Sequence, residues 1–162
     1  NELVINRKNN ICVNSLIRDK EEYLNFEEIN DKGQASSLNN TLLSKVIIND
    51  DDTDDVDNWT KNKVEKYGTI KKIIKKKTTT MELVLDKNNC PKIIDYFSLD
   101  VEGMEYKVLK NFPFEKYQIN LLGIEHPTSP KLIKLLEKYF TFIRIIGDDY
   151  FYVNKMFNNY NI

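Results

Sequence analysis

The 162-residue sequence has few of the residues that build glycine-rich loops, metal clusters and membrane spans. Its five glycines are not clustered, and its two cysteines, Cys12 and Cys90, do not form a CxxC pair or a zinc spacing. No apolar run approaches the ~20 residues that a membrane helix needs, and no secretory signal opens the sequence. We therefore expect a reduced, cytoplasmic protein without a membrane partner.

The charges are nearly balanced, with a net charge of −1. A basic run at 71–77, KKIIKKK, is offset by an acidic run at 49–58, NDDDTDDVDN. A nucleic-acid partner is not expected, because its phosphates call for a strongly basic surface. The acidic run lacks the ordered spacing of a calcium loop, so we interpret residues 50–69 as an acidic surface loop or insertion.

A single domain over 1–162 is expected, since hydrophobic residues make up 41% of this short chain. The sequence opens at Asn1 rather than at a methionine, inside what reads as the end of a helix over residues 1–7. We interpret this start as N-terminal truncation.

The second half of the sequence alternates apolar strands with helices. Two short apolar runs, at 93–99 and 118–125, have the character of buried parallel strands. A helical pattern follows each of them, and the second helix opens with Ser129 as N-cap and Pro130 at its first position. Residues 142–154 read as a hairpin around Gly147. This alternation predicts an α/β fold with a parallel sheet, helices on both faces and a closing antiparallel hairpin.

The first half is expected to contribute further strands and one helix. The apolar patterns predict strands at 11–17, 22–29, 45–49 and 70–77. A helix is predicted to start with Thr79 as N-cap and Glu82 as its capping-box partner. The segment ASSL at 35–38 fits a turn or the lining of a pocket.

Polar residues follow the two apolar strands of the second half at the points where each strand ends. Asp100, Glu102, Gly103 and Glu105 follow the first strand, and the second ends in Glu125 and His126. Ligands of open parallel sheets bind at the carboxyl ends of the strands. Simpler explanations remain open: acids are favoured in the first turn of any helix, Gly103 permits tight packing, and His126 before Pro127 fits a turn cap.

The segment IDYFSLDVEGMEYKVLKNFPFEKYQINLLGIEH, at 94–126, resembles the signature of the FkbM-family methyltransferases. That signature is a strand ending in Asp-Val-Glu-Gly-x-Glu, a helix, an aromatic-rich turn and a strand ending in Glu. The matching positions are Asp100, Val101, Glu102, Gly103, Glu105, Leu109 and Glu125. Looser similarity extends to NRKNNICVNSLI at 6–17, to the threonine-rich lead at 78–96 and to GDDYFYVNK at 147–155.

The resemblance implies part of a class I methyltransferase (Rossmann-like) sheet and an S-adenosylmethionine-dependent O-methyltransferase acting on a sugar or other small hydroxyl acceptor. Methyl transfer to a hydroxyl also needs a group that removes the hydroxyl proton, so the candidate catalytic residues at the strand ends are Asp100, Glu102, Glu125 and His126, with His126 as a possible base. The cofactor would contact Asn14, Ser15 and Asp100. No metal ligand is assigned, although Asp100 with Glu125 could hold Mg²⁺.

The family's glycine-rich cofactor loop has no counterpart in the sequence. The alternative interpretation is therefore a non-catalytic remnant or binding module of the same fold. The two interpretations differ in whether the chain binds the cofactor.

Overall fold

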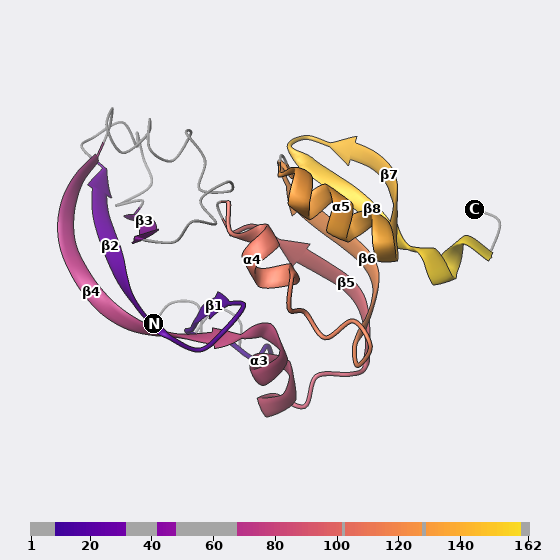
Figure 1. Cartoon of the computed structure of the whole chain (residues 1–162), viewed down its shortest axis with the longest axis horizontal. Helices are drawn as coiled ribbons and strands as arrows, with labels where there is room; N and C mark the ends of the chain where they lie inside the picture. Colours follow the sequence, from indigo (N-terminus) through magenta and orange to yellow (C-terminus); the bar gives the residue numbers. More distant parts are fainter. Residues whose placement is uncertain (1–8, 32–41, 48–67, 102, 128, 160–162) are drawn as a thin grey trace.

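The computed structural model describes residues 9–31, 42–47, 68–101, 103–127 and 129–159. These residues form two four-stranded sheets (Figure 1). The first sheet has the order β1–β4–β2–β3 and the second has the order β5–β6–β8–β7. The strands are β1 (Leu16–Arg18), β2 (Tyr23–Asp31), β3 (Leu42–Ile47), β4 (Gly68–Thr80), β5 (Ile93–Leu99), β6 (Gln118–Glu125), β7 (Phe140–Ile146) and β8 (Asp149–Asn154). The helices are α3 (Met81–Lys87), α4 (Glu105–Leu109), α5 (Pro130–Tyr139) and the 3₁₀ helix η2 (Lys155–Asn159).

The second sheet confirms the predicted alternation of strands and helices. Strands β5 and β6 have the predicted bounds and pair in parallel, and α4 connects them. Helix α5 begins as predicted, because Ser129 Oγ accepts the backbone N–H of Leu132 and Pro130 is the first helical residue. The closing hairpin is antiparallel, and β8 lies between β6 and β7. An α/β fold is thus confirmed.

The first sheet departs from the predicted bounds. The strand expected at 11–17 begins only at Leu16, while β4 extends from Gly68 to Thr80. The helix cap is Thr80 rather than Thr79, and Thr80 Oγ1 accepts the N–H of Leu83 at 3.3 Å. The reason is that the threonines at 78–80 pair in parallel with β1, which keeps Thr79 in the strand. Predictions for residues 1–7, 35–38 and most of 50–69 lie outside the described residues.

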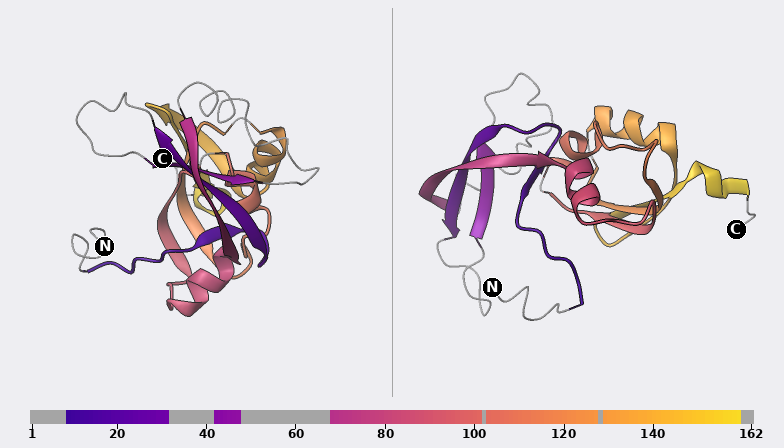
Figure 2. Two further views of the ribbon diagram at one scale, coloured as in Figure 1. Left: turned by 90° about the vertical axis from the view of Figure 1, so that its left-hand side faces the viewer. Right: turned by 90° about the horizontal axis from the view of Figure 1, so that it is seen from below.

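The prediction that the 93–99 strand is fully buried is wrong. Strand β5 is at the edge of its sheet, and Leu99 is its one buried residue. The sequence predicted helices on both faces, but α4 and α5 both lie on one face of the sheet (Figure 2). On this covered face, Phe97 packs edge-on against Phe112. On the other face, Tyr96 is 49% exposed and its ring lies over Gly123. Apolar composition shows that a strand can be buried, but which helices cover it depends on the rest of the fold.

The core lies between the helices and strands β5 and β6. Its buried residues include Leu109 of α4, Leu122 and Ile124 of β6, and Leu136 of α5. An aromatic group closes the core on one side, where Phe114 stacks on Tyr139 with ring centroids 4.0 Å apart. In the described part of the chain, no helix is long and apolar enough to span a membrane.

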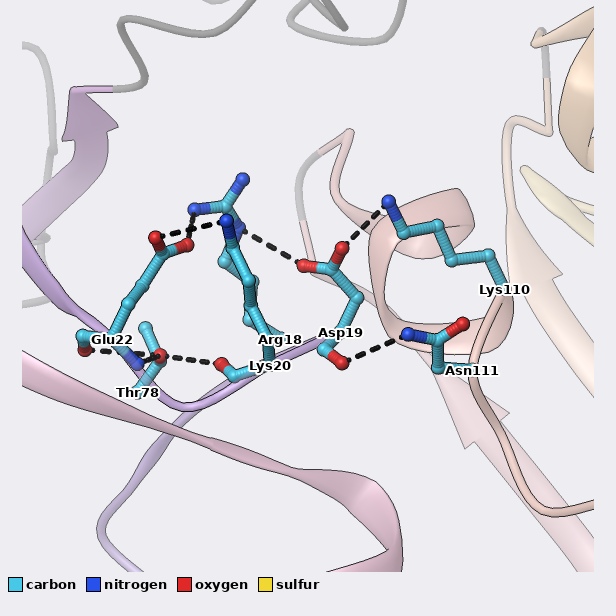
Figure 3. Close-up of polar contacts among 7 residues, drawn as sticks. All are labelled: Arg18, Asp19, Lys20, Glu22, Thr78, Lys110 and Asn111. Carbon is cyan, nitrogen blue, oxygen red and sulfur yellow. Dashed lines mark hydrogen bonds and ion pairs between the residues drawn. The ribbon is translucent and has the colours of Figure 1, made fainter.

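A buried ionic network joins β1 to α4 and so links the two sheets (Figure 3). Arg18 is 2% exposed and pairs with Glu22 and with Asp19, whose side chain is 8% exposed. Asp19 Oδ2 lies 2.6 Å from Lys110 Nζ at the end of α4. The side chain of Asn111 donates to the Asp19 carbonyl oxygen at 3.0 Å. Asp19, directly after β1, therefore connects the first sheet to the end of α4.

The same turn is fixed to β4 by Thr78, which is 1% exposed. Its hydroxyl donates to the carbonyl oxygen of Lys20 at 2.7 Å and accepts the N–H of Glu22 at 2.8 Å. A buried hydroxyl with both partners in place stabilises the turn that presents Asp19.

We expect Leu136→Ala to lower the free energy of unfolding by about 2–5 kcal/mol, because it leaves a cavity in the core. Ile133→Ala is the matched control, since Ile133 is on the same helix but is 40% exposed. Chemical denaturation of both variants measures the difference. Equal losses would contradict the placement of α5 against the core.

We expect Asp19→Asn to destabilise the protein by about 2–4 kcal/mol, because it leaves two cations around a buried amide. Burial alone would raise the pKa of Asp19, but the Lys110 hydrogen bond and the charges of Lys110 and Arg18 lower it below its ordinary value. With a lowered folded pKa, the stabilisation is present above the unfolded pKa and is lost as the pH falls through the folded value.

Denaturation of the wild type and of Asp19→Asn across the acid range tests this assignment. The stability difference is expected to shrink below about pH 4. Glu21→Gln, which removes an exposed pair with Lys77, serves as the control and should have no measurable effect. A difference that persists unchanged at acid pH would show that the Asp19 charge is not its source.

Candidate functional site

The carboxyl ends of β5 and β6 bring three predicted site residues to one edge of the second sheet. The parallel register pairs Leu99 with Ile124, so Asp100 and Glu125 are the next residues along the two neighbouring strands. His126 follows Glu125 directly. Adjacent strands are about 4.8 Å apart, which places the Asp100 and Glu125 backbones side by side. As expected, the polar residues that follow β5 and β6 therefore lie at the same edge of the sheet.

Glu105 fixes the loop that follows β5. Its carboxylate Oε1 accepts the backbone N–H of Val101 at 3.3 Å and that of Gly103 at 3.2 Å. Helix α4 has no side-chain bond at its N-cap, Met104, so Glu105 at its first position reaches back to the loop instead. Gly103 has φ +90°, a backbone conformation that glycine adopts without strain.

Glu105 is 7% exposed, and its surroundings change the acidity of its carboxyl group. Burial raises its pKa, and the nearby Asp100 charge raises it further, while the backbone hydrogen bonds from Glu105, Gly103 and Val101 act in the opposite direction. The structural explanation for Glu105 therefore has direct support: the residue shapes the loop that carries Asp100.

His126 lies where the end of β6 meets the turn of the β7–β8 hairpin. It adopts φ +39°, its backbone N–H donates to the carbonyl oxygen of Asp148 at 3.2 Å, and its Nε2 lies 3.6 Å from Asp148 Oδ1. Glu125, His126 and Asp148 each present a ligand atom within 4.8 Å of the others, and they are the one such group of three among the described residues. The imidazole thus lies beside two carboxylates.

The structure leaves some predicted site residues apart from this edge. Asn14 and Ser15 are exposed and precede β1, and among the described residues they form no hydrogen bond or ion pair with Asp100. Glu102 lies outside the described residues.

Asp148 was missed by the sequence interpretation, which used Gly147 and its neighbours only as a turn signal. The pairing of Glu125 with Asp149 brings that turn to the end of β6.

The arrangement can bind polar ligands and transfer protons. Asp100 and Glu125 offer carboxylate acceptors, and the exposed imidazole of His126 can take up a proton. Donor groups such as hydroxyls and amines are the natural partners of such an edge. The fold is that of an α/β protein, and its candidate functional groups lie at the carboxyl ends of parallel strands.

A comparison with known protein families identifies the family to which this α/β chain belongs. Residues 6–150 match the methyltransferase FkbM domain, so the chain belongs to the FkbM methyltransferase family. Neither a curated protein nor a solved structure matches the chain significantly. The match covers the strand ends that hold Asp100, Glu125 and His126.

We expect Glu105→Gln to change how stability depends on pH. A raised folded pKa means that the folded state binds more protons than the unfolded state just above the ordinary glutamate pKa. The wild type should therefore lose stability relative to Glu105→Gln as the pH rises from about 4 towards 7. Denaturation at several pH values measures this difference.

Glu115→Gln removes an exposed acid from the turn before β6 and is the control for a general charge effect. It should give a stability curve parallel to that of the wild type. If the curves of Glu105→Gln and the wild type also run parallel, the Glu105 carboxyl is not the group that titrates.

Proposed function

We propose that the chain is an S-adenosylmethionine-dependent methyltransferase that methylates a hydroxyl of a sugar or another small molecule. The observation that carries this proposal is the meeting of Asp100, Glu125 and His126 at one strand-end edge in a chain of the FkbM methyltransferase family. A nucleic-acid partner is not part of the proposal, since the net charge is −1.

The topology of the second sheet supports a class I methyltransferase fold. That fold closes with an antiparallel hairpin whose last strand is inserted next to a parallel strand. Here β8 runs antiparallel between β6 and β7, while β5 and β6 are parallel. The order β5–β6–β8–β7 would then be the second half of such a sheet.

The hydrogen-bond donors of S-adenosylmethionine match the carboxylate acceptors at the carboxyl ends of β5 and β6. S-adenosylmethionine carries an ammonium group, ribose hydroxyls and an adenine amine, all of which can donate to carboxylates. Asp100 is exposed at the end of β5, and the Glu105 hydrogen bonds hold the loop after it. Asp100 is accordingly proposed as a cofactor contact, together with Asn14 and Ser15 from the segment before β1.

The bound cofactor supplies an electrophilic methyl group. The chain's own residues would orient the acceptor hydroxyl and remove its proton. We assign proton acceptance to the His126 imidazole, with Glu125 beside it to orient the hydroxyl. Glu125 would orient the acceptor hydroxyl towards the methyl group that the cofactor would supply, and the His126 imidazole would accept the proton that the hydroxyl loses. Glu102 is kept as a further candidate because the family motif includes it.

A non-catalytic binding module is the second candidate, and the lack of a glycine cluster in the sequence favours it. The glycine-rich loop is the part of a Rossmann-like site at which the backbone comes closest to the cofactor. A chain without that loop would bind the cofactor weakly or not at all.

Calorimetric titration with S-adenosylhomocysteine separates the two candidates. The proposal predicts saturable binding that Asp100→Ala weakens by about tenfold or more, since a hydrogen bond to a charged group is worth about 1.5–3 kcal/mol. Asp95→Ala is the matched control: it removes an exposed acid from the other end of the same strand and should leave the affinity unchanged.

Three outcomes have distinct meanings. Binding that depends on Asp100 but not on Asp95 supports the methyltransferase proposal. Equal affinity in all three proteins would remove Asp100 from the site. Absence of binding by the folded wild type would leave the non-catalytic module as the better account.

A further inference from the structure

We propose that Glu125, His126 and Asp148 form a binding site for a divalent transition-metal ion. The site lies where the end of β6 meets the two-residue turn between β7 and β8. Its three ligand atoms come from two segments that are distant in sequence and lie within 4.8 Å of one another. The site shares Glu125 and His126 with the strand-end edge of the proposed function and adds Asp148 from the hairpin turn.

The fold brings the two segments together through backbone contacts. Glu125 pairs with Asp149 in the antiparallel register of β6 and β8. The backbone N–H of His126 donates to the Asp148 carbonyl oxygen at 3.2 Å. Gly147 turns the chain with φ +62°, a backbone conformation that glycine adopts readily. This turn brings Asp148 next to His126 at the end of β6. The ligand side chains therefore start from fixed backbone positions.

The spacing of the ligand atoms is close to that of a metal site. Bonds from zinc or similar ions to nitrogen and oxygen are about 2.1 Å long, so neighbouring ligand atoms are roughly 3–4 Å apart. His126 Nε2 and Asp148 Oδ1 are already 3.6 Å apart. His126 is 60% exposed and Asp148 is 74% exposed, so both can rotate to complete the geometry and an ion can enter from solvent.

The donor set indicates which ions would bind. One imidazole with two carboxylates suits Mn²⁺, Fe²⁺, Co²⁺ or Zn²⁺, because imidazole favours transition metals over Mg²⁺ and Ca²⁺. Two carboxylates neutralise the charge of a divalent ion. The three residues leave coordination positions for water or for a ligand oxygen, as in metal sites that are open to substrate.

Metal binding would compete with proton acceptance at His126, because both use the same lone pair of the ring. The metal site is therefore tested by binding rather than by turnover. Titration is done without the methyl donor, so its result does not depend on whether the chain transfers methyl groups. Conversely, S-adenosylhomocysteine binding can fail while the metal site stands.

The experiment is a calorimetric and absorption titration of the tag-free chain with Co²⁺. His126 is the one histidine of the sequence, so imidazole ligation can be assigned to it without ambiguity. We expect the wild type to bind one Co²⁺ per chain. The Co²⁺ affinity should be at least about tenfold lower in His126→Asn and in Asp148→Asn, since mutating even a residue that only hydrogen-bonds to a metal ligand lowers metal affinity by about tenfold or more. Asparagine tolerates the positive φ of position 126, which keeps the variant folded.

Asp149→Asn is the charge-matched control. It removes the same charge one residue away from Asp148 and should leave Co²⁺ affinity unchanged. Thermal unfolding without metal shows whether each variant is folded. If Co²⁺ does not bind the wild type, or binds it no better than His126→Asn, the proposal is wrong. Equal losses in Asp148→Asn and Asp149→Asn would mean that acidic charge alone attracts the ion, which also overturns it.

Discussion

The buried carboxylate of Glu105 is the interaction on which the candidate site depends. It accepts the N–H groups of Val101 and Gly103, and so fixes the loop between β5 and α4. Asp100 begins that loop, and the end of β6 lies beside it. Helix α4 has no side-chain hydrogen bond at its N-cap, so these two bonds tie its first residue to the loop that follows Asp100. The cost is a carboxyl group kept largely away from water, which burial makes less acidic.

A second buried acid, Asp19, connects the other sheet to the same helix, α4. Its carboxylate lies between Arg18 and Lys110, and Asn111 donates to its carbonyl oxygen (Figure 3). Because α4 carries Lys110 at its end and Glu105 at its start, one short helix receives both contacts. Helix α4 therefore supports both the ionic link to the first sheet and the loop of the candidate site.

Much of the second sheet could be predicted from the sequence, because local signals agree there with the final packing. The apolar runs of β5 and β6, the Ser129 cap and the turn at Gly147 each specify an element through its own residues. The exposure of Tyr96 and the contact of His126 with Asp148 could not be predicted, since both depend on segments far apart in sequence. The shift of the helix cap from Thr79 to Thr80 likewise follows from pairing between β1 and β4.

The central proposal is that a methyl-donor cofactor binds at the carboxyl ends of β5 and β6. The most direct test is to map the backbone amides that respond to S-adenosylhomocysteine by nuclear magnetic resonance. The account predicts that the shifted amides cluster at residues 100–105 and 125–126, with β7 and the far end of β5 unaffected. Shifts confined to other parts of the chain, or saturating ligand without any shift, would contradict it.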